Sequence, residues 1–161
     1  MDCRSTVRQI KGAVETVVKN VELMADDPAL SGLSFTHPGH DAAVMVVVAD
    51  ADARTMQPTT TVLIVLGDWD DLQKDTDDVF KLFSLNAQLM GCAVAVVPFN
   101  EDERAVVLCR RLPVDELPPE EVLPTIDGMA WEYASVSGWI EQAEKETLEG
   151  VQPAVEEAGG E

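Results

Sequence analysis

The most constraining feature of this sequence is a set of three predicted strands that are apolar on both faces. From Ala42 to Ala49, one face carries only alanine and valine, and the other carries alanine, valine and one methionine. The segments from Val62 to Leu66 and from Cys92 to Phe99 repeat the pattern without a charged side chain. A strand with one solvated face would alternate apolar with polar residues. We therefore expect helices of the chain to cover one face of the sheet, and the other face to be the functional surface.

The spacing of apolar residues predicts three helices around these strands. From about Arg4 to Ala25, apolar side chains recur at three- and four-residue steps, which is typical of an amphipathic helix. A second helix, from Asp75 or Thr76 to about Met90, is apolar around most of its circumference, so we expect burial on more than one side. A third helix, which carries tryptophan and tyrosine, is expected from about Pro124 or Thr125 to Thr147.

Turn residues divide the remaining sequence into five strands. A short strand near Leu33 to Thr36 precedes the one that begins at Ala42, and a third runs from Thr60 to Leu66. A hairpin then joins Cys92 to Phe99 with Ala105 to Leu112. The predicted order is helix-strand-strand-strand-helix-strand-strand-helix, an α+β single domain with an antiparallel sheet over residues 1–147. The acidic Gly/Pro/Glu tail, residues 148–161, lacks large apolar groups, and we expect it to be disordered.

Charge and composition exclude several classes of partner. Among 161 residues, 30 acidic and 11 basic side chains give a net charge of −19, which repels nucleic acid and anionic membranes. A helix that spans a bilayer needs about 20 apolar residues, and no apolar run in this sequence is that long. The first ten residues also lack the apolar core of a signal peptide. The three cysteines show no paired spacing, which favours a reducing compartment. We therefore expect a cytoplasmic protein.

Residues with potential for catalysis or metal binding do not form a recognised motif. His37 and His40 lie on a turn, but a zinc site would need a second pair of ligands at a similar spacing. The acidic run from Asp68 to Asp78 does not follow the calcium-loop pattern, so helix capping is the favoured interpretation. Cys92 and Cys109 are expected to be buried, inert thiols. The sequence thus predicts no catalytic residue, no metal and no cofactor.

Four features of the second half of the sequence occur together in a known family. A helix contains the pair Leu85 and Asn86, a hairpin follows it directly, an Arg-Leu-Pro sequence closes the hairpin at Arg111 to Pro113, and an aromatic helix comes last. In these features the stretch from Val79 to Trp139 resembles the class I type III secretion chaperones, the Tir chaperone family. Upstream, the valine-rich helix and the sequence from Leu63 to Asp68 fit the family's first half. The resemblance therefore covers about residues 4–147.

The resemblance implies a non-catalytic homodimer that binds an extended segment of a secreted effector and keeps it soluble and competent for secretion. Dimerisation would involve the second helix and nearby strands, with Phe80, Leu82, Phe83, Ala87, Cys92, Val94 and Val96 as candidates. The effector segment would lie along grooves formed by the first helix and the first three strands. The candidates there are either Val44, Val46, Val62 and Ile64 or their alternates Met45, Val47, Leu63 and Val65.

Two other functions remain open at this point. A sheet of this type also occurs in sensory-transduction regulators of related fold, so a regulator that binds a folded protein partner is the second hypothesis. A metal-dependent enzyme that uses the acidic residues is the third.

Overall fold

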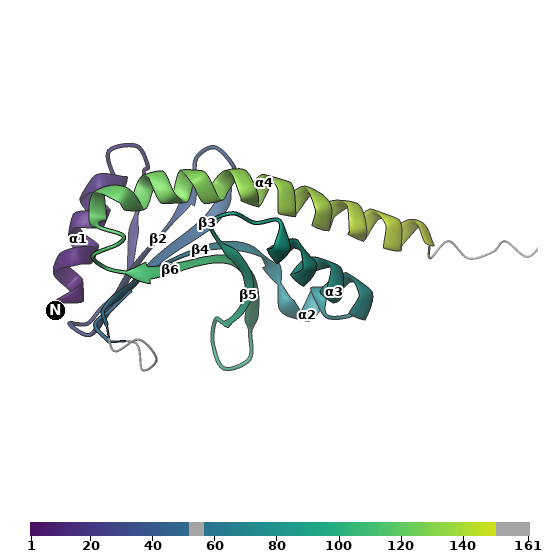
Figure 1. Cartoon of the computed structure of the whole chain (residues 1–161), viewed down its shortest axis with the longest axis horizontal. Coiled ribbons are helices and arrows are strands. Elements are labelled where there is room, and N and C mark those ends of the chain that lie inside the picture. Colours follow the sequence, from purple (N-terminus) through teal and green to yellow (C-terminus); the bar gives the residue numbers. More distant parts are fainter. Residues whose placement is uncertain (52–56, 151–161) are drawn as a thin grey trace, which may run out of the picture.

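Six antiparallel strands form one sheet, and the first and last helices of the chain pack together on one face of it (Figure 1). The structure is a computed structural model that describes residues 1–51 and 57–150, with backbone only from residue 143 onward. The predicted α+β class with an antiparallel sheet is confirmed. In chain order the elements are α1 (Cys3–Val14), β1 (Glu22–Asp26), β2 (Leu30–His37), β3 (Ala42–Ala49), β4 (Thr59–Asp68), α2 (Trp69–Leu72), α3 (Thr76–Ser84), the 3₁₀ turn η1 (Leu85–Ala87), β5 (Ala93–Pro98), β6 (Arg104–Pro113) and α4 (Pro119–Gly150).

The sheet has the strand order β1-β2-β3-β4-β6-β5, so the hairpin of β5 and β6 joins the sheet through its second strand. The register decides which side chains share a face. Val46 and Val62 are paired across β3 and β4, whereas Met45 and Leu63, one residue along each strand, are paired on the opposite face. Because successive side chains of a strand point to opposite sides, this register separates two apolar faces.

The face that carries Val46 forms the hydrophobic core together with α1 and α4. Burying a valine, leucine or isoleucine side chain stabilises a fold by about 1.5–3 kcal/mol, so this layer is the main source of stability. The fully buried side chains of this layer include Val44, Val46, Val62 and Ile64 of the sheet, Val7, Ile10 and Val14 of α1, and Val122 and Ile126 of α4.

The first helix is shorter than the sequence predicts. It ends at Val14 instead of near Ala25, and Asn20 then takes a left-handed conformation with φ of 62°. After this turn, residues Glu22–Asp26 pair with β2 as the edge strand β1, which adds a strand to the predicted five. Val18 and Val21 misled the prediction, because both are buried at helical spacing but lie in the turn between α1 and β1.

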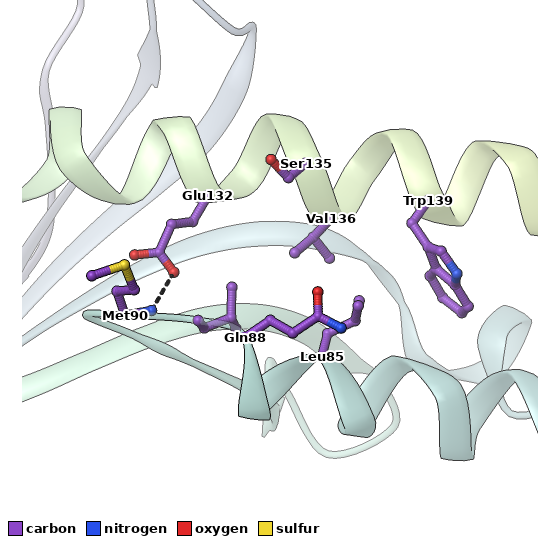
Figure 2. A pocket seen from close by; sticks show the side chains of 8 residues that line it. Leu85, Gln88, Met90, Glu132, Ser135, Val136 and Trp139 are labelled. Atoms are coloured by element: carbon purple, nitrogen blue, oxygen red, sulfur yellow. Dashed lines mark hydrogen bonds between the residues drawn. The ribbon is translucent and has the colours of Figure 1, made fainter.

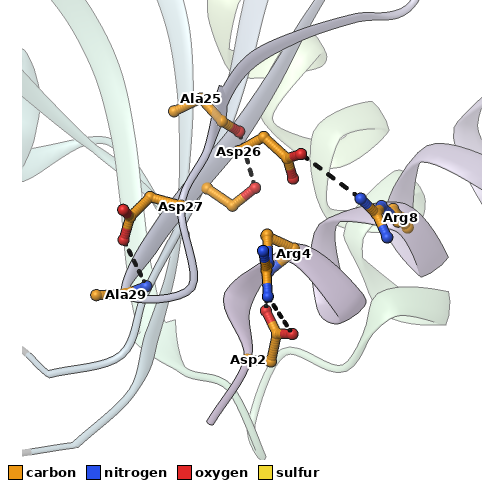
Figure 3. Close-up of polar contacts among 8 residues, drawn as sticks. Asp2, Arg4, Arg8, Ala25, Asp26, Asp27 and Ala29 are labelled. Atoms are coloured by element: carbon orange, nitrogen blue, oxygen red, sulfur yellow. Dashed lines mark hydrogen bonds and ion pairs between the residues drawn. The ribbon is translucent and has the colours of Figure 1, made fainter.

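Polar contacts connect the start of α1 with the new edge strand (Figure 3). The carboxylate of Asp2 caps α1 by accepting a hydrogen bond from the backbone N–H of Arg4 at 3.1 Å. One turn later, the guanidinium of Arg8 lies 3.5 Å from the carboxylate of Asp26 on β1. Exposed ion pairs contribute only about 0–1 kcal/mol each. These contacts therefore favour one orientation of α1 but add little to the stability of the fold.

The second predicted helix is divided into α3 and the turn η1. Asp75 caps α3 as the sequence indicated, but the helix does not continue to Met90. Instead, the side-chain oxygen of Asn86 accepts a hydrogen bond from the backbone N–H of Val94 at 2.6 Å, and its amide donates to the Val94 carbonyl at 3.4 Å. Asparagine side chains compete in this way with regular backbone structure. The pair of bonds attaches η1 to β5.

The last helix begins earlier than predicted. α4 starts at Pro119, where the missing N–H of proline is tolerated because the first turn of a helix has no partner for it. Pro124, the predicted start, lies inside the helix. At the other end α4 continues to Gly150, beyond residue 147, the predicted end of the domain. From residue 151 onward the predicted disordered tail lies outside the described residues.

Candidate binding surface

The sheet face opposite α1 and α4 is apolar, and neither of these helices lies on it (Figure 1). Val47, Leu63 and Val65 remain partly exposed there, although their neighbours on the covered face are fully buried. We call this surface the open face. Its apolar residues on the central strands are Ala43, Met45, Val47, Leu63, Val65, Val107 and Cys109. The face is not uniformly accessible, because Val107 is 0% exposed and Met45 is 7% exposed.

The register distinguishes the two alternative sets of effector-binding candidates. The set of Val44, Val46, Val62 and Ile64 is 0% exposed and forms the core beneath α1 and α4, so none of these side chains is accessible in the folded protein. The alternate set of Met45, Val47, Leu63 and Val65 lies on the open face. Met45 is 7% exposed, and the other three are partly exposed.

A trough of about 400 Å³ lies at the β1 end of the open face. Met24 of β1 and Phe99 after β5 are each about half exposed, and both line the trough together with Met45 and Val65. A hollow of this volume is large enough to hold a side chain of a partner or a small ligand. Its lining consists of Asn20, Glu22, Met24, Ser34, Phe35, Thr36, Ala43, Val44, Met45, Val65 and Phe99.

The β5–β6 turn holds Phe99 at the trough. The backbone N–H of Phe99 donates to the carbonyl of Glu103 at 2.8 Å. Within the turn, the side-chain oxygen of Asn100 accepts from the backbone N–H groups of Asp102 and Glu103 at 2.9 Å and 2.8 Å. An asparagine that bonds to the backbone two residues on is a typical turn-former. Phe99 is therefore fixed by its turn, and sequence periodicity gave no indication that it would lie near β1.

The open face is more polar at the end where Thr61 of β4 pairs with Arg111 of β6. The Nε–H of Arg111 donates to the hydroxyl of Thr61 across the β4–β6 pair at 3.0 Å. Thr61 is only 6% exposed and Thr59, on the same face, is 3% exposed. The open face thus changes from apolar side chains around Met45 to threonine and arginine toward this end.

A second hollow, of about 430 Å³, lies between α4 and η1 (Figure 2). Figure 2 shows Val136 and Trp139 of α4 facing Leu85 and Gln88 across it. Glu132 connects the two walls at one end, where its carboxylate accepts a hydrogen bond from the backbone N–H of Met90 at 3.1 Å. We call this hollow the α4 groove. Its lining residues are Leu85, Gln88, Leu89, Met90, Glu132, Ser135, Val136 and Trp139.

Burial and the same carboxylate disfavour the thiolate form of Cys92. The thiol of Cys92 donates to Glu132 at 3.4 Å, and burial together with the negative charge of Glu132 raises the pKa of Cys92 to about 12. Burial also raises the pKa of Cys109, while the nearby Arg111 lowers it. Because the thiolate is the reactive form, neither thiol resembles a catalytic nucleophile.

The dimer candidates fall into three groups by exposure. Phe80 is 75% exposed and Ala87 is exposed, whereas Leu82 and Val94 belong to the core at 1% and 4%. The partly buried candidates are Phe83, whose ring lies 6.3 Å from that of Trp69, and Cys92 and Val96.

Two further apolar side chains near this region are exposed. Trp131 is 77% exposed on α4, at the border of the apolar stripe where the sequence places it, and an aromatic residue there can anchor a partner. Met90 is 95% exposed, and sequence reasoning missed it because the second helix was expected to continue to Met90 and to be buried.

The histidines and the acidic run have structural partners. The Nε2 of His37 lies 3.2 Å from the carboxylate of Asp127, and its Nδ1 accepts from the backbone N–H of Gly39 at 3.1 Å. Asp68 and Asp75 cap α2 and α3. Among the described residues, no group of three or more His, Cys, Asp or Glu side chains is placed to hold a metal ion.

Comparison with known proteins does not assign a family. No protein-family model matches the chain, and no curated protein matches it. Within the described part of the chain, no helix has both the length and the apolar character required to cross a membrane.

Proposed function

We propose that this protein is a non-catalytic, cytoplasmic chaperone-like protein that binds an extended segment of a secreted effector and keeps it soluble and competent for secretion. The observation that carries the proposal is the open face, an apolar sheet surface that α1 and α4 leave uncovered. Contiguous exposed apolar surface usually marks a binding site, because it is unfavourable in water. The resemblance to class I type III secretion chaperones gives the same function.

An extended segment suits this surface better than a compact ligand. Alternate side chains of a strand-like segment can enter a hollow such as the trough, while the other side chains face solvent. The edge strand β1 borders the trough and is exposed along most of its length. Edge strands present unpaired backbone groups to which a further strand can add.

The proposed function includes dimerisation of two copies of the chain through α3. Phe80 and Ala87 provide exposed apolar surface on α3 and η1. Large aromatic side chains commonly dominate the binding energy of interfaces, which makes Phe80 the principal dimer residue. The core residues Leu82 and Val94 would support α3 and β5 from behind rather than contact the second copy.

The test uses a matched pair of variants and, as the partner, a secreted protein encoded by a neighbouring gene. Val65→Asn places an amide in the trough, and Val17→Asn makes the same change at a residue that is 61% exposed and does not line it. We expect co-purification through the N-terminal segment of the secreted protein with the unchanged chain and with Val17→Asn, and loss of it with Val65→Asn. Equal co-purification with both variants would contradict the proposal.

A regulator that binds a folded partner is the second candidate. The observation that favours it is the set of exposed side chains around α3 and α4, namely Phe80, Met90 and Trp131. A partner captured through a compact domain, with binding sensitive to Trp131→Ala and insensitive to Val65→Asn, would support this function instead of the first.

A further inference from the structure

We infer that the segment bound at the trough is basic as well as apolar, with an apolar centre flanked on both sides by lysine or arginine. The inference rests on the proposed function, because it names the chemistry of the segment that the open face binds. The composition of the trough and the charges at its two rims support it.

The apolar centre matches the lining of the trough. Met24 and Met45 contribute flexible thioether side chains, and Phe99 and Val65 complete the wall. Methionine adapts to irregular apolar shapes, so such a lining accepts several aliphatic side chains rather than one. Apolar contact alone would therefore not determine which segment binds.

One rim of the trough carries an acidic side chain without an internal partner. Glu22 lines the trough, and its carboxylate makes no hydrogen bond or ion pair with the described residues. The other acidic residues of this region are engaged (Figure 3): Asp26 lies 3.5 Å from Arg8, and Asp27 accepts from the backbone N–H of Ala29 at 2.8 Å. Glu22 is thus the carboxylate of β1 that is left for a ligand.

The other rim is the turn that holds Phe99. Glu101 and Asp102 follow Phe99 closely, both are exposed, and neither side chain is bonded to another described residue. The acidic residues of the two rims are Glu22, Glu101, Asp102 and Glu103, and the nearest basic residues in sequence are Lys19 and Arg104. Negative charge is therefore in excess at the rims. A low-dielectric hollow between like charges concentrates ligands of the opposite charge.

Charge complementarity also argues against a nucleic acid in the trough, because its phosphates would be repelled by the acidic rims. A second copy of this chain is proposed to contact Phe80 on α3, which does not line the trough. An apolar segment flanked by lysine or arginine gains attraction at both rims and keeps its apolar centre in the trough.

The test measures binding of three synthetic peptides of about nine residues, the length of a long strand. All three share one valine- and leucine-rich centre, and their flanks contain lysine, serine or glutamate. We expect the dissociation constant of the lysine peptide to be about threefold to tenfold lower than that of the serine peptide, the range for a few exposed ion pairs. The glutamate peptide should bind most weakly. Salt of about 0.5 M should abolish the difference between lysine and serine.

Matched variants locate the effect. Glu22→Gln, and the double variant Glu101→Gln with Asp102→Asn, should weaken the lysine peptide by about twofold to threefold each and leave the serine peptide unchanged. Glu141→Gln removes an exposed carboxylate on α4, away from the open face, and should change neither peptide.

Each alternative result has a defined meaning. Equal affinity for the lysine and serine peptides overturns the charge inference but leaves binding at the open face intact, provided that Val65→Asn weakens both. A lysine preference that Val65→Asn and Glu22→Gln do not alter places binding elsewhere, which overturns the inference. If no peptide binds, the inference is overturned, and the co-purification experiment with the secreted protein decides the proposed function separately.

Discussion

The two faces of the sheet have nearly the same apolar composition but very different environments. On β4, Ile64 is completely buried beneath the helices, whereas Leu63, its neighbour on the open face, remains partly exposed. On β3, Val46 and Val47 differ in the same way. Composition alone therefore does not separate the residues that stabilise this fold from those available for binding. What separates them is which face α1 and α4 cover.

The largest predicted effect compares these two faces at adjacent residues. Ile64→Ala removes buried methyl groups and leaves a cavity, so it should lower the free energy of unfolding by about 2–5 kcal/mol. Leu63→Ala removes a partly exposed side chain and should cost about 1 kcal/mol or less. Urea unfolding of both variants measures the difference. Equal losses would show that the open face is as tightly packed as the core, and the comparison would fail.

Most of the fold was predictable from the sequence, because hydrophobic periodicity reports burial directly. The central strands, the hairpin and the aromatic stripe of α4 all follow from it. The edge strand β1 did not, since the valines and Met24 recur at three- and four-residue steps, which favours a continued helix. The chain instead turns at Asn20, which takes the left-handed conformation that asparagine adopts more readily than most residues, and Glu22–Asp26 then pairs with β2.

The candidate site was only half predictable. That both faces of the central strands are apolar was visible in the sequence, but a two-residue period is identical on either face. Whether Val62 or Leu63 faces the helices depends on tertiary packing, so that choice required coordinates. The trough also depends on long-range structure, because Met24 and Phe99 line it together although they are far apart in the chain.

The next prediction separates an exposed aromatic residue from a packed one on the same helix. Phe80→Glu should convert the proposed dimer to monomer and change the stability of each copy by about 0.5 kcal/mol or less, because the side chain is already 75% exposed. Phe83→Glu should destabilise the fold itself, since Phe83 packs against Trp69. Light scattering and thermal melting distinguish the two outcomes. An unchanged mass for Phe80→Glu would argue against an interface on α3.

Cysteine reactivity provides a direct comparison of the two faces in the intact protein. Cys109 lies on the open face opposite Leu63, whereas Cys92 is bonded to Glu132 and Cys3 is completely buried. At pH 8, iodoacetamide should modify Cys109 at least about tenfold faster than Cys92, because a pKa of about 12 leaves almost no thiolate at Cys92.

Mass spectrometry of the modified peptides gives the order of reaction. A bound segment on the open face should slow the reaction of Cys109 and leave that of Cys92 unchanged. Faster modification of Cys92 would contradict both its partial burial and its contact with Glu132.

The smallest predicted effect is a pH dependence that originates at Cys92. Burial and the neighbouring carboxylate of Glu132 raise its pKa from 9.0 to about 12, so the folded protein holds the thiol proton more tightly than the unfolded chain does. The resulting stabilisation is fully present below pH 9 and is lost as the pH rises from about 9 to about 12.

Cys92→Ala should therefore lose less stability than the unchanged chain over this interval, measured by urea unfolding at pH 8, 9 and 10. Cys109→Ala, which removes a thiol on the open face, should flatten the dependence of the free energy of unfolding on pH less than Cys92→Ala does. If Cys109→Ala flattened it more, the open face would hold its thiol more tightly than the covered side of the sheet, contrary to the contrast between the two faces.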